Sequence, residues 1–204
     1  MGKPRGLIFG VGINDSDYVT NKRVDGKNIV CPFYRSWLSM FLRCYCQKNQ
    51  ENHPTYIGCS VATEWHSFMG FRGWMIGQEW EGKSLDKDIL IMGNKIYSSG
   101  SCIFISRRLN NLLCDRALMR GDLPLGVSRY RKSYQSHVSK EGKPCGLGSF
   151  ETPIQAHSAW QKAKSEIIEQ AANEQTDERI KNALIQRVKQ LRDDLANGRE
   201  TIKL

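Results

Sequence analysis

The stretch SLDKDILIMGNKIYSSGSCIFISRRLNN, residues 84–111, decides how the rest of the chain is interpreted. Its pattern predicts a strand that begins at Leu85, turns at Gly93 and Asn94, and returns over the residues up to 97. A short apolar strand over 102–105 follows, and Ser106 is a suitable N-cap for a helix over 107–120. The stretch therefore predicts a compact unit of strands followed by a helix.

Two side chains of this unit are suited to hold a divalent cation. Asp86 ends the first predicted strand and Asn110 lies in the helix, and oxygen ligands of this kind suit Mg²⁺ or Mn²⁺. A nuclease also needs a base for the attacking water. The neighbouring Lys87 does not provide one, because lysine with a pKa near 10.4 is protonated at neutral pH, and Asp88 would be a weak base. The residues leave open an active nuclease, a degenerate one, and an Asp-rich turn without metal.

The composition favours a polyanionic partner. The 204 residues carry 30 Lys and Arg against 21 acidic residues, a formal net charge of +9, and nucleic acid is the commonest partner of such a chain. No apolar run approaches the roughly 20 residues of a membrane span. The seven scattered cysteines fit a reducing cytoplasm. Cys44, Cys46, His53, Cys59 and His66 lie close together in the sequence, but their spacing matches no common zinc finger. We therefore expect the three cysteines to be buried thiols and not zinc ligands.

The first part of the chain predicts two aromatic helices after a loop-rich arm. Residues 1–30 are rich in Gly, Asp and Asn, with one short strand expected over 7–13. Pro32 begins a helix, and the second helix, over 62–78, ends near Gly77. Helical spacing predicts that the buried residues of the two helices are Tyr34, Trp37, Leu38, Phe41, Leu42, Tyr45, Trp65, Phe68, Phe71 and Met75.

After a hinge at 121–126, the pattern changes to short strands separated by basic or Gly-rich turns. Alternation places Val127, Tyr134, Ser136, Val138, Leu147 and Phe150 inside, and Ser128, Gln135, His137 and Ser139 outside. A helix capped by Thr152, with Pro153 at its first position, is expected to bury Ala156, Ala159, Trp160, Ala163 and Ile167. A last helix over 177–196 carries the stripe Ile180, Leu184, Val188, Leu191 and Leu195. That stripe would either dimerise or pack on its own domain.

Several stretches together resemble one phage family. They are FYRSWLSMFLRCY, PTYIGCSVATEWHSFMGFRGWM, LDKDILIMGNKIYSSGSCIFISRRLNN, and PLGV followed by LGSFETPIQAHSAWQKAK. In this order they resemble His-Asn-His homing endonucleases that carry an Apetala-type (ethylene-response-factor) DNA-binding domain, and the resemblance covers residues 5 to about 170.

The resemblance implies an α+β fold in three parts. Residues 1–122 would form the endonuclease-like domain, with the N-terminal arm, the two aromatic helices and a degenerate ββα-metal hairpin. Residues 123–170 would form a three-stranded antiparallel sheet packed on a helix, and 171–204 an amphipathic C-terminal helix.

The resemblance also assigns roles in the endonuclease-like part. Asp86 falls on the metal-ligand aspartate, Lys87 on the general-base histidine, and Asn110, or else Asn111, on the last ligand of the helix. Because a lysine replaces the base, the resemblance implies weak or lost cleavage, with Lys87 on a phosphate. The turn SSGS also departs from the Pro-Glu-like turn usual in the family.

In the second part, the resemblance implies a sheet that lies in the major groove of duplex DNA. Base-reading positions would be Ser128, Tyr130, Gln135, His137 and Ser139, and basic positions beside them Arg129, Arg131, Lys132, Lys140 and Lys143. Arg107 and Arg108, before this part, are further basic positions that we expect to bind DNA without regard to sequence. The plant pattern has more Arg and a Trp on this face. The expected function is a phage DNA-binding protein in the cytoplasm of an infected bacterium, with weak metal-dependent nicking or none. The alternative is a non-catalytic phage regulator or an inhibitor of a host DNA-acting or defence system, with a host protein as its target.

Overall fold

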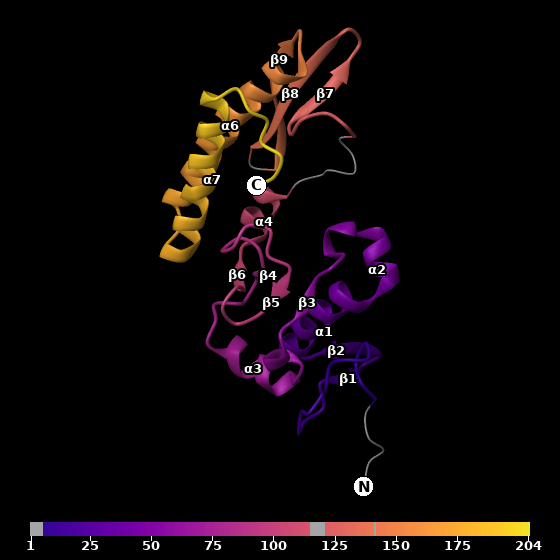
Figure 1. Cartoon of the computed structure of the whole chain (residues 1–204). Helices are drawn as coiled ribbons and strands as arrows, with labels where there is room; N and C mark the ends of the chain where they lie inside the picture. Colours follow the sequence, from indigo (N-terminus) through magenta and orange to yellow (C-terminus); the bar gives the residue numbers. More distant parts are fainter. Residues whose placement is uncertain (1–5, 115–120, 141) are drawn as a thin grey trace. The chain divides into compact units, whose positions relative to one another are not determined.

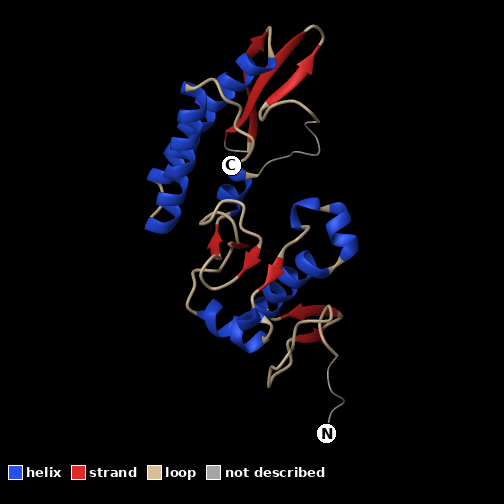
Figure 2. Cartoon of the chain, viewed as in Figure 1, coloured by secondary structure: helices blue, strands red, loops and turns tan. Residues whose placement is uncertain are grey.

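The structure is a computed structural model that describes residues 6–114, 121–140 and 142–204. It divides into two compact units, Met1–Ile105 and Ser106–Leu204, which are described separately. Helices and small sheets are both present, so the chain has the predicted α+β fold (Figures 1 and 2). Within the described residues, no helix is long and apolar enough to cross a membrane.

The first unit joins helices to small two-stranded sheets. Its elements are β1 (Asn21–Val24), β2 (Lys27–Val30), α1 (Pro32–Tyr45), α2 (Gln47–Asn52), β3 (Ser60–Val61), α3 (Phe68–Ile76), β4 (Ser84–Asp86), β5 (Ile96–Tyr97) and β6 (Ile103–Ile105), with short 3-10 turns at Pro54–Tyr56 and Thr63–Trp65. The arm contains a hairpin that the sequence analysis missed. Its turn is Asp25-Gly26, with φ of 49° and 75°, a pair whose twist matches that of the flanking strands. Over 7–13 there is no strand, only isolated bridges at Ile8 and Ile13.

An aromatic cluster forms the core of the first unit. The residues expected from α3 and the turn before it are buried: Trp65, Phe68, Phe71 and Met75. Helix α1 buries Trp37 and Phe41 as expected, and the Trp37 indole N–H donates to the carbonyl of Trp65 at 2.8 Å. The predicted stripe was wrong at its edge. Leu42 is 38% exposed, whereas Met40 and Cys44 are buried, because α1 turns that neighbouring face toward the core.

The strands around residues 84–105 do not pair as expected. Strand β4 does not return on β5; it pairs antiparallel with β6, whereas β5 pairs parallel with β3. The reason lies in the loop between them. The side-chain amide of Asn94 donates to the carbonyls of Lys87 and Ile96, both at 2.7 Å, and this closes the loop without a β ladder. The order strand, strand, helix is kept along the chain by β4, β6 and α4.

The second unit is an antiparallel sheet packed on a helical hairpin. Its described elements are α4 (Arg107–Leu113), β7 (Val127–Tyr130), β8 (Ser133–Lys140), β9 (Lys143–Phe150), α6 (Pro153–Asn173) and α7 (Glu178–Ala196), and the sheet order is β7-β8-β9. Helix α6 crosses one face of the sheet and contacts all three strands, and α7 lies along α6 (Figure 1). Of the helix expected over 107–120, α4 ends at Leu113 and Cys114 is extended, and residues 115–120 lie outside the described residues.

Helix α6 begins at the predicted residues. Thr152 and Gln155 form a reciprocal capping box, and Pro153 is in the first turn. Its buried face was only partly predicted. Ala156 and Trp160 are buried, but Ala159, Ala163 and Ile167 are half-buried. Three apolar positions near its end, Ile168, Ala171 and Ala172, are buried as well. Four buried positions are polar: His157, Gln161, Lys164 and Ser165.

Helix α6 is covered on a second side as well, away from the sheet. Helix α7 packs against α6 with the buried residues Ile180, Leu184, Val188 and Leu191. The apolar stripe of α7 is therefore covered by its own chain.

We predict that Gly126→Ala strongly destabilises the second unit. Gly126 has φ of +75°, and a Cβ atom there would lie 1.9 Å from Cδ1 of Trp160. The backbone conformation and the overlap together should lower the free energy of unfolding by about 3 kcal/mol or more. Gly142, with φ of +78° and open space around it, is the matched control, and Gly142→Ala should lower it by only about 1 kcal/mol. Urea unfolding measures both, and equal losses would contradict the prediction.

Candidate nucleic-acid interface and the Asp86 cluster

One face of the three-stranded sheet is covered by α6, and the other carries the predicted base-reading residues. In β8, Gln135, His137 and Ser139 are exposed, whereas Ser136 and Val138 between them are buried, as the alternation predicts. Directly opposed residues share a face, so the register places Ser128, Gln135 and Ser149 in one row across the outer face. Of these, Ser128 is half-buried.

The environment of His137 leaves its side chain open to solvent. Its cross-strand partner is Gly146, and the register shifts between Ser136 and His137, where Leu147 is the extra residue of β9. A glycine opposite His137 puts no side chain beside the imidazole, and a bulge increases local twist. The expected inner positions Tyr134, Leu147 and Phe150 are only half-buried.

The two turns of the sheet carry exposed cations. Arg131 and Lys132 form the β7–β8 turn, and Lys140 and Lys143 flank the β8–β9 turn. Within the part of the chain that the structure describes, none of these cations forms an ion pair. Their charge is therefore available to a polyanion.

Arg131 has an unusual backbone for an arginine. Its φ is 53°, in the left-handed region that side chains rarely adopt, and turns of this length favour Gly, Asn or Asp there. The guanidinium lies over the ring of Tyr130, 5.4 Å from its centroid, and Tyr130 is 49% exposed. A cation and an aromatic ring are thus held together at the tip of the sheet.

The other predicted basic residues differ in position. Arg129 shares the face of Val127 and donates to the hydroxyl of Tyr134 at 3.2 Å. Arg107 and Arg108 are exposed on α4, and Arg108 forms an ion pair of 2.8 Å with Glu174. Arg129 and Arg108 therefore already have partners in their own unit.

In the first unit, Asp86 organises the turn that follows β4. Its Oδ1 accepts from the backbone N–H groups of Asp88 at 3.0 Å and Ile89 at 2.7 Å. Burial, together with the nearby negative charge of Asp88, raises the pKa of this carboxyl, and the two N–H groups and Lys87 act in the opposite direction. The geometry is that of a carboxylate that fixes a turn.

Lys87 lies inside the unit rather than on its surface. Its side chain is 8% exposed, its ammonium is 3.2 Å from the carboxylate of Asp88, and it lies 5.9 Å from the centroid of the Tyr97 ring. The expected phosphate contact needs an accessible ammonium, so this geometry does not favour it.

The oxygen donors around Asp86 do not fit a divalent cation. One Asp86 oxygen receives two N–H groups, and Asp88 is paired with an ammonium. Asn110 and Asn111 are exposed on α4, which belongs to the second unit. Among the described residues, no group of at least three His, Cys, Asp and Glu side chains is placed to hold a metal ion. We therefore derive no metal-dependent step, and cleavage stays a prediction of the resemblance.

The residues that surround this turn were not predicted from the sequence. Arg43 of α1 donates to the hydroxyl of Tyr97 at 3.4 Å and lies 5.5 Å from the centroid of the Tyr56 ring. Burial raises the pKa of the Tyr97 hydroxyl, although Arg43 acts in the opposite direction. The signal in the sequence was Arg43, which lies between Phe41 and Tyr45 of the apolar pattern of α1.

The cysteines named in the sequence analysis lie in the first unit. Cys44 and Cys59 are buried and Cys46 is half-buried. Burial raises the pKa of the Cys44 thiol to about 12. The ring Nε2 of His66 is 3.0 Å from the carbonyl of Val61.

No protein-family model, curated protein or solved structure gives a significant match to this chain.

We predict that Asp86→Asn unfolds no more easily than the wild type at pH 7, whereas Asp86→Ala loses about 1–3 kcal/mol. Asn keeps an acceptor for the two N–H groups, and Ala leaves them without one. Because folding raises the pKa of Asp86, ionisation of this carboxyl opposes folding as the pH rises from about 3.8 through the folded pKa.

The free energy of unfolding of Asp86→Asn should therefore exceed that of the wild type at pH 7 but not at pH 3.5. Chemical denaturation at the two pH values measures this difference. If Asp86→Asn loses as much stability as Asp86→Ala at pH 7, the prediction is wrong and the turn needs the negative charge of Asp86.

Proposed function

We propose that this chain is a phage DNA-binding protein whose outer sheet face lies in the major groove of duplex DNA. The groove is about 12 Å wide and admits a small β structure. Gln135 and His137 would face base edges, and the turn cations would contact phosphates on either side. The phage setting and the cytoplasm of the infected bacterium are part of this proposal and rest on the family resemblance.

The observation that carries the proposal is Arg131. A left-handed position in a short turn is best filled by glycine, and a side chain there costs about 1–2 kcal/mol. Strain of this kind is typical of positions that are retained for function. Here the strained residue is a cation without an ion pair among the described residues, and it stands at the edge of the exposed face.

Binding without cleavage is the activity that we propose. The donors around Asp86 are engaged by backbone N–H groups and by the Lys87 ammonium. In the first unit, the Asp86 carboxylate therefore stabilises a turn. The second unit has an exposed polar face with cations beside it, which is suited to bind DNA.

We predict that Arg131→Gly weakens binding to all duplex sequences without lowering stability. Glycine removes the charge and relaxes the turn, so the free energy of unfolding should stay the same or rise by up to about 1 kcal/mol. The slope of log affinity against log salt should become shallower by about one, since one phosphate contact is lost. Fluorescence anisotropy with labelled duplexes at several salt concentrations gives the slope.

Lys162→Ala is the matched control, because it removes the same charge from the exposed side of α6. Its slope should equal that of the wild type. Equal slopes for all three proteins, or no binding of wild type at low salt, would refute the proposal.

We predict that Gln135→Ala and His137→Ala relax sequence preference. Each side chain is exposed on the outer face, and a base contact of this kind discriminates by about 1–3 kcal/mol. Selection of bound duplexes from a random pool should give a motif for wild type that loses information at one position in each variant. Ser139→Ala, near the end of β8 on the same face, should change the motif least. Identical motifs for all four proteins would remove the readout role.

A further inference from the structure

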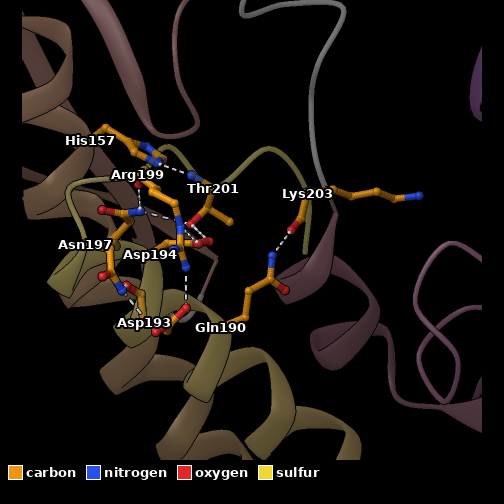
Figure 3. Close-up of polar contacts among 9 residues, drawn as sticks. His157, Gln190, Asp193, Asp194, Asn197, Arg199, Thr201 and Lys203 are labelled. Atoms are coloured by element: carbon orange, nitrogen blue, oxygen red, sulfur yellow. Dashed lines mark hydrogen bonds and ion pairs between the residues drawn. The ribbon is translucent and has the colours of Figure 1, made fainter.

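The residues after α7 fold back over α6 instead of extending into solvent. We call residues 197–204 the C-terminal segment. Gly198, with φ of 63°, allows the chain to reverse at the end of α7. Arg199 then forms ion pairs with Asp193 and Asp194 of α7, and Gln190 donates to the carbonyl of Lys203 at 3.2 Å (Figure 3).

Thr201 is the point at which the C-terminal segment enters the core. It is fully buried, with an exposed fraction of 0%. Its hydroxyl donates to the carboxylate of Asp194 at 2.9 Å and accepts from the side chain of Gln161 at 3.0 Å. Its backbone N–H donates to Nε2 of His157 at 3.0 Å (Figure 3).

These contacts fix the protonation of His157, which is also fully buried. The other ring nitrogen, Nδ1, lies 2.9 Å from the carbonyl oxygen of Leu125. A carbonyl can only accept, so Nδ1 carries the proton, and the Thr201 N–H can only donate, so Nε2 carries none. The ring is therefore neutral, with one defined tautomer, and Nε2 has no place for a second proton while Thr201 is bound.

We propose that His157 is a proton-gated latch that holds the C-terminal segment on the second unit. Protonation would place a hydrogen on Nε2 that faces the backbone N–H of Thr201, so this N–H would lose its acceptor. The Nδ1–H bond to Leu125 survives protonation, so the change acts on the segment and not on the entry to β7. Release of the segment would expose Gln161 and the His157 side of α6.

The sign of the pH dependence follows from this geometry. The latched form excludes a proton that the released form accepts, so the latch is intact at neutral pH and weakens with acid. Below the ordinary histidine pKa of about 6.5, the ratio of latched to released molecules should fall by up to roughly tenfold per pH unit.

Charged groups on several elements modulate the latch. On α7, the carboxylate of Asp194 reaches it through the Thr201 hydroxyl and would favour an imidazolium. Arg199 of the segment pairs with Asp193 and Asp194 and opposes that effect. On α6, the buried ammonium of Lys164 donates to the carbonyl of Leu112 at 2.6 Å, and Glu200 and Lys203 of the segment are exposed. Among the residues before β7, Leu125 contributes its neutral carbonyl, which accepts from Nδ1.

Solution NMR of the full chain between pH 7.5 and 5 tests the proposal without DNA. The ring nitrogen shifts of His157 report its protonation, and exchange of the Thr201 amide proton, relative to an unstructured chain at each pH, reports the latch. We expect protection of this amide to fall at least tenfold as the ring becomes protonated. The amide of Ile168, buried in α6, should keep its protection.

Two substitutions at one position separate the latch from simple packing. Thr201→Pro removes the donor N–H, and Thr201→Ser keeps both the N–H and the hydroxyl. Coupling between the segment and the proton is reciprocal. In Thr201→Pro, the titration midpoint of His157 should therefore rise by about one pH unit for each tenfold of latch stability lost, whereas Thr201→Ser should titrate like wild type.

Several results would overturn the proposal. They are a ring that stays neutral down to pH 5, Thr201 protection that is unchanged when the ring is protonated, and a fall that Ile168 shares equally. An unshifted midpoint in folded Thr201→Pro would also overturn it. If Thr201→Pro does not fold, the wild-type titration decides alone, because it compares Thr201 with Ile168 in one sample.

Discussion

The contact between Gly126 and Trp160 holds the second unit together. The indole of Trp160 occupies the space that any side chain at Gly126 would need, so the start of β7 and the middle of α6 approach as closely as a backbone and a ring allow. Val127 and Val138 are buried on the same side of the sheet. Once α6 covers that side, alternation along β8 leaves Gln135 and His137 on the other. The exposed face is thus a consequence of close packing on the covered one.

The sequence predicted well where one physical signal dominated. Thr152-Pro153 fixed the start of α6, and alternation sorted Gln135 and His137 from Ser136 and Val138. It predicted poorly where two elements cover one helix. Periodicity assumes that polar side chains face water, but His157 and Gln161 are buried because the C-terminal segment supplies their hydrogen bonds. A partner so distant along the chain leaves no local pattern.

The candidate site of the first unit shows a different limit. A carboxylate next to a turn has two common uses, to hold a cation or to accept backbone N–H groups, and both use the same residue type. Spacing alone could not choose between them for Asp86. The positions of the Asp88 and Ile89 amides favour the second use. The strand pairing could not be predicted from the local pattern either, because β4 pairs with β6 and not with β5, which is nearer in the sequence.

The fold-back of the C-terminal segment also bears on protein synthesis. Residues 1–105 form a compact unit of their own, so this unit can fold while the rest of the chain is still being made. The second unit cannot complete its polar core until Thr201 has emerged from the ribosome, because Thr201 supplies a hydrogen-bond donor to His157 and an acceptor to Gln161. A nascent chain that stops before residue 201 would therefore carry a finished first unit and an incomplete second one.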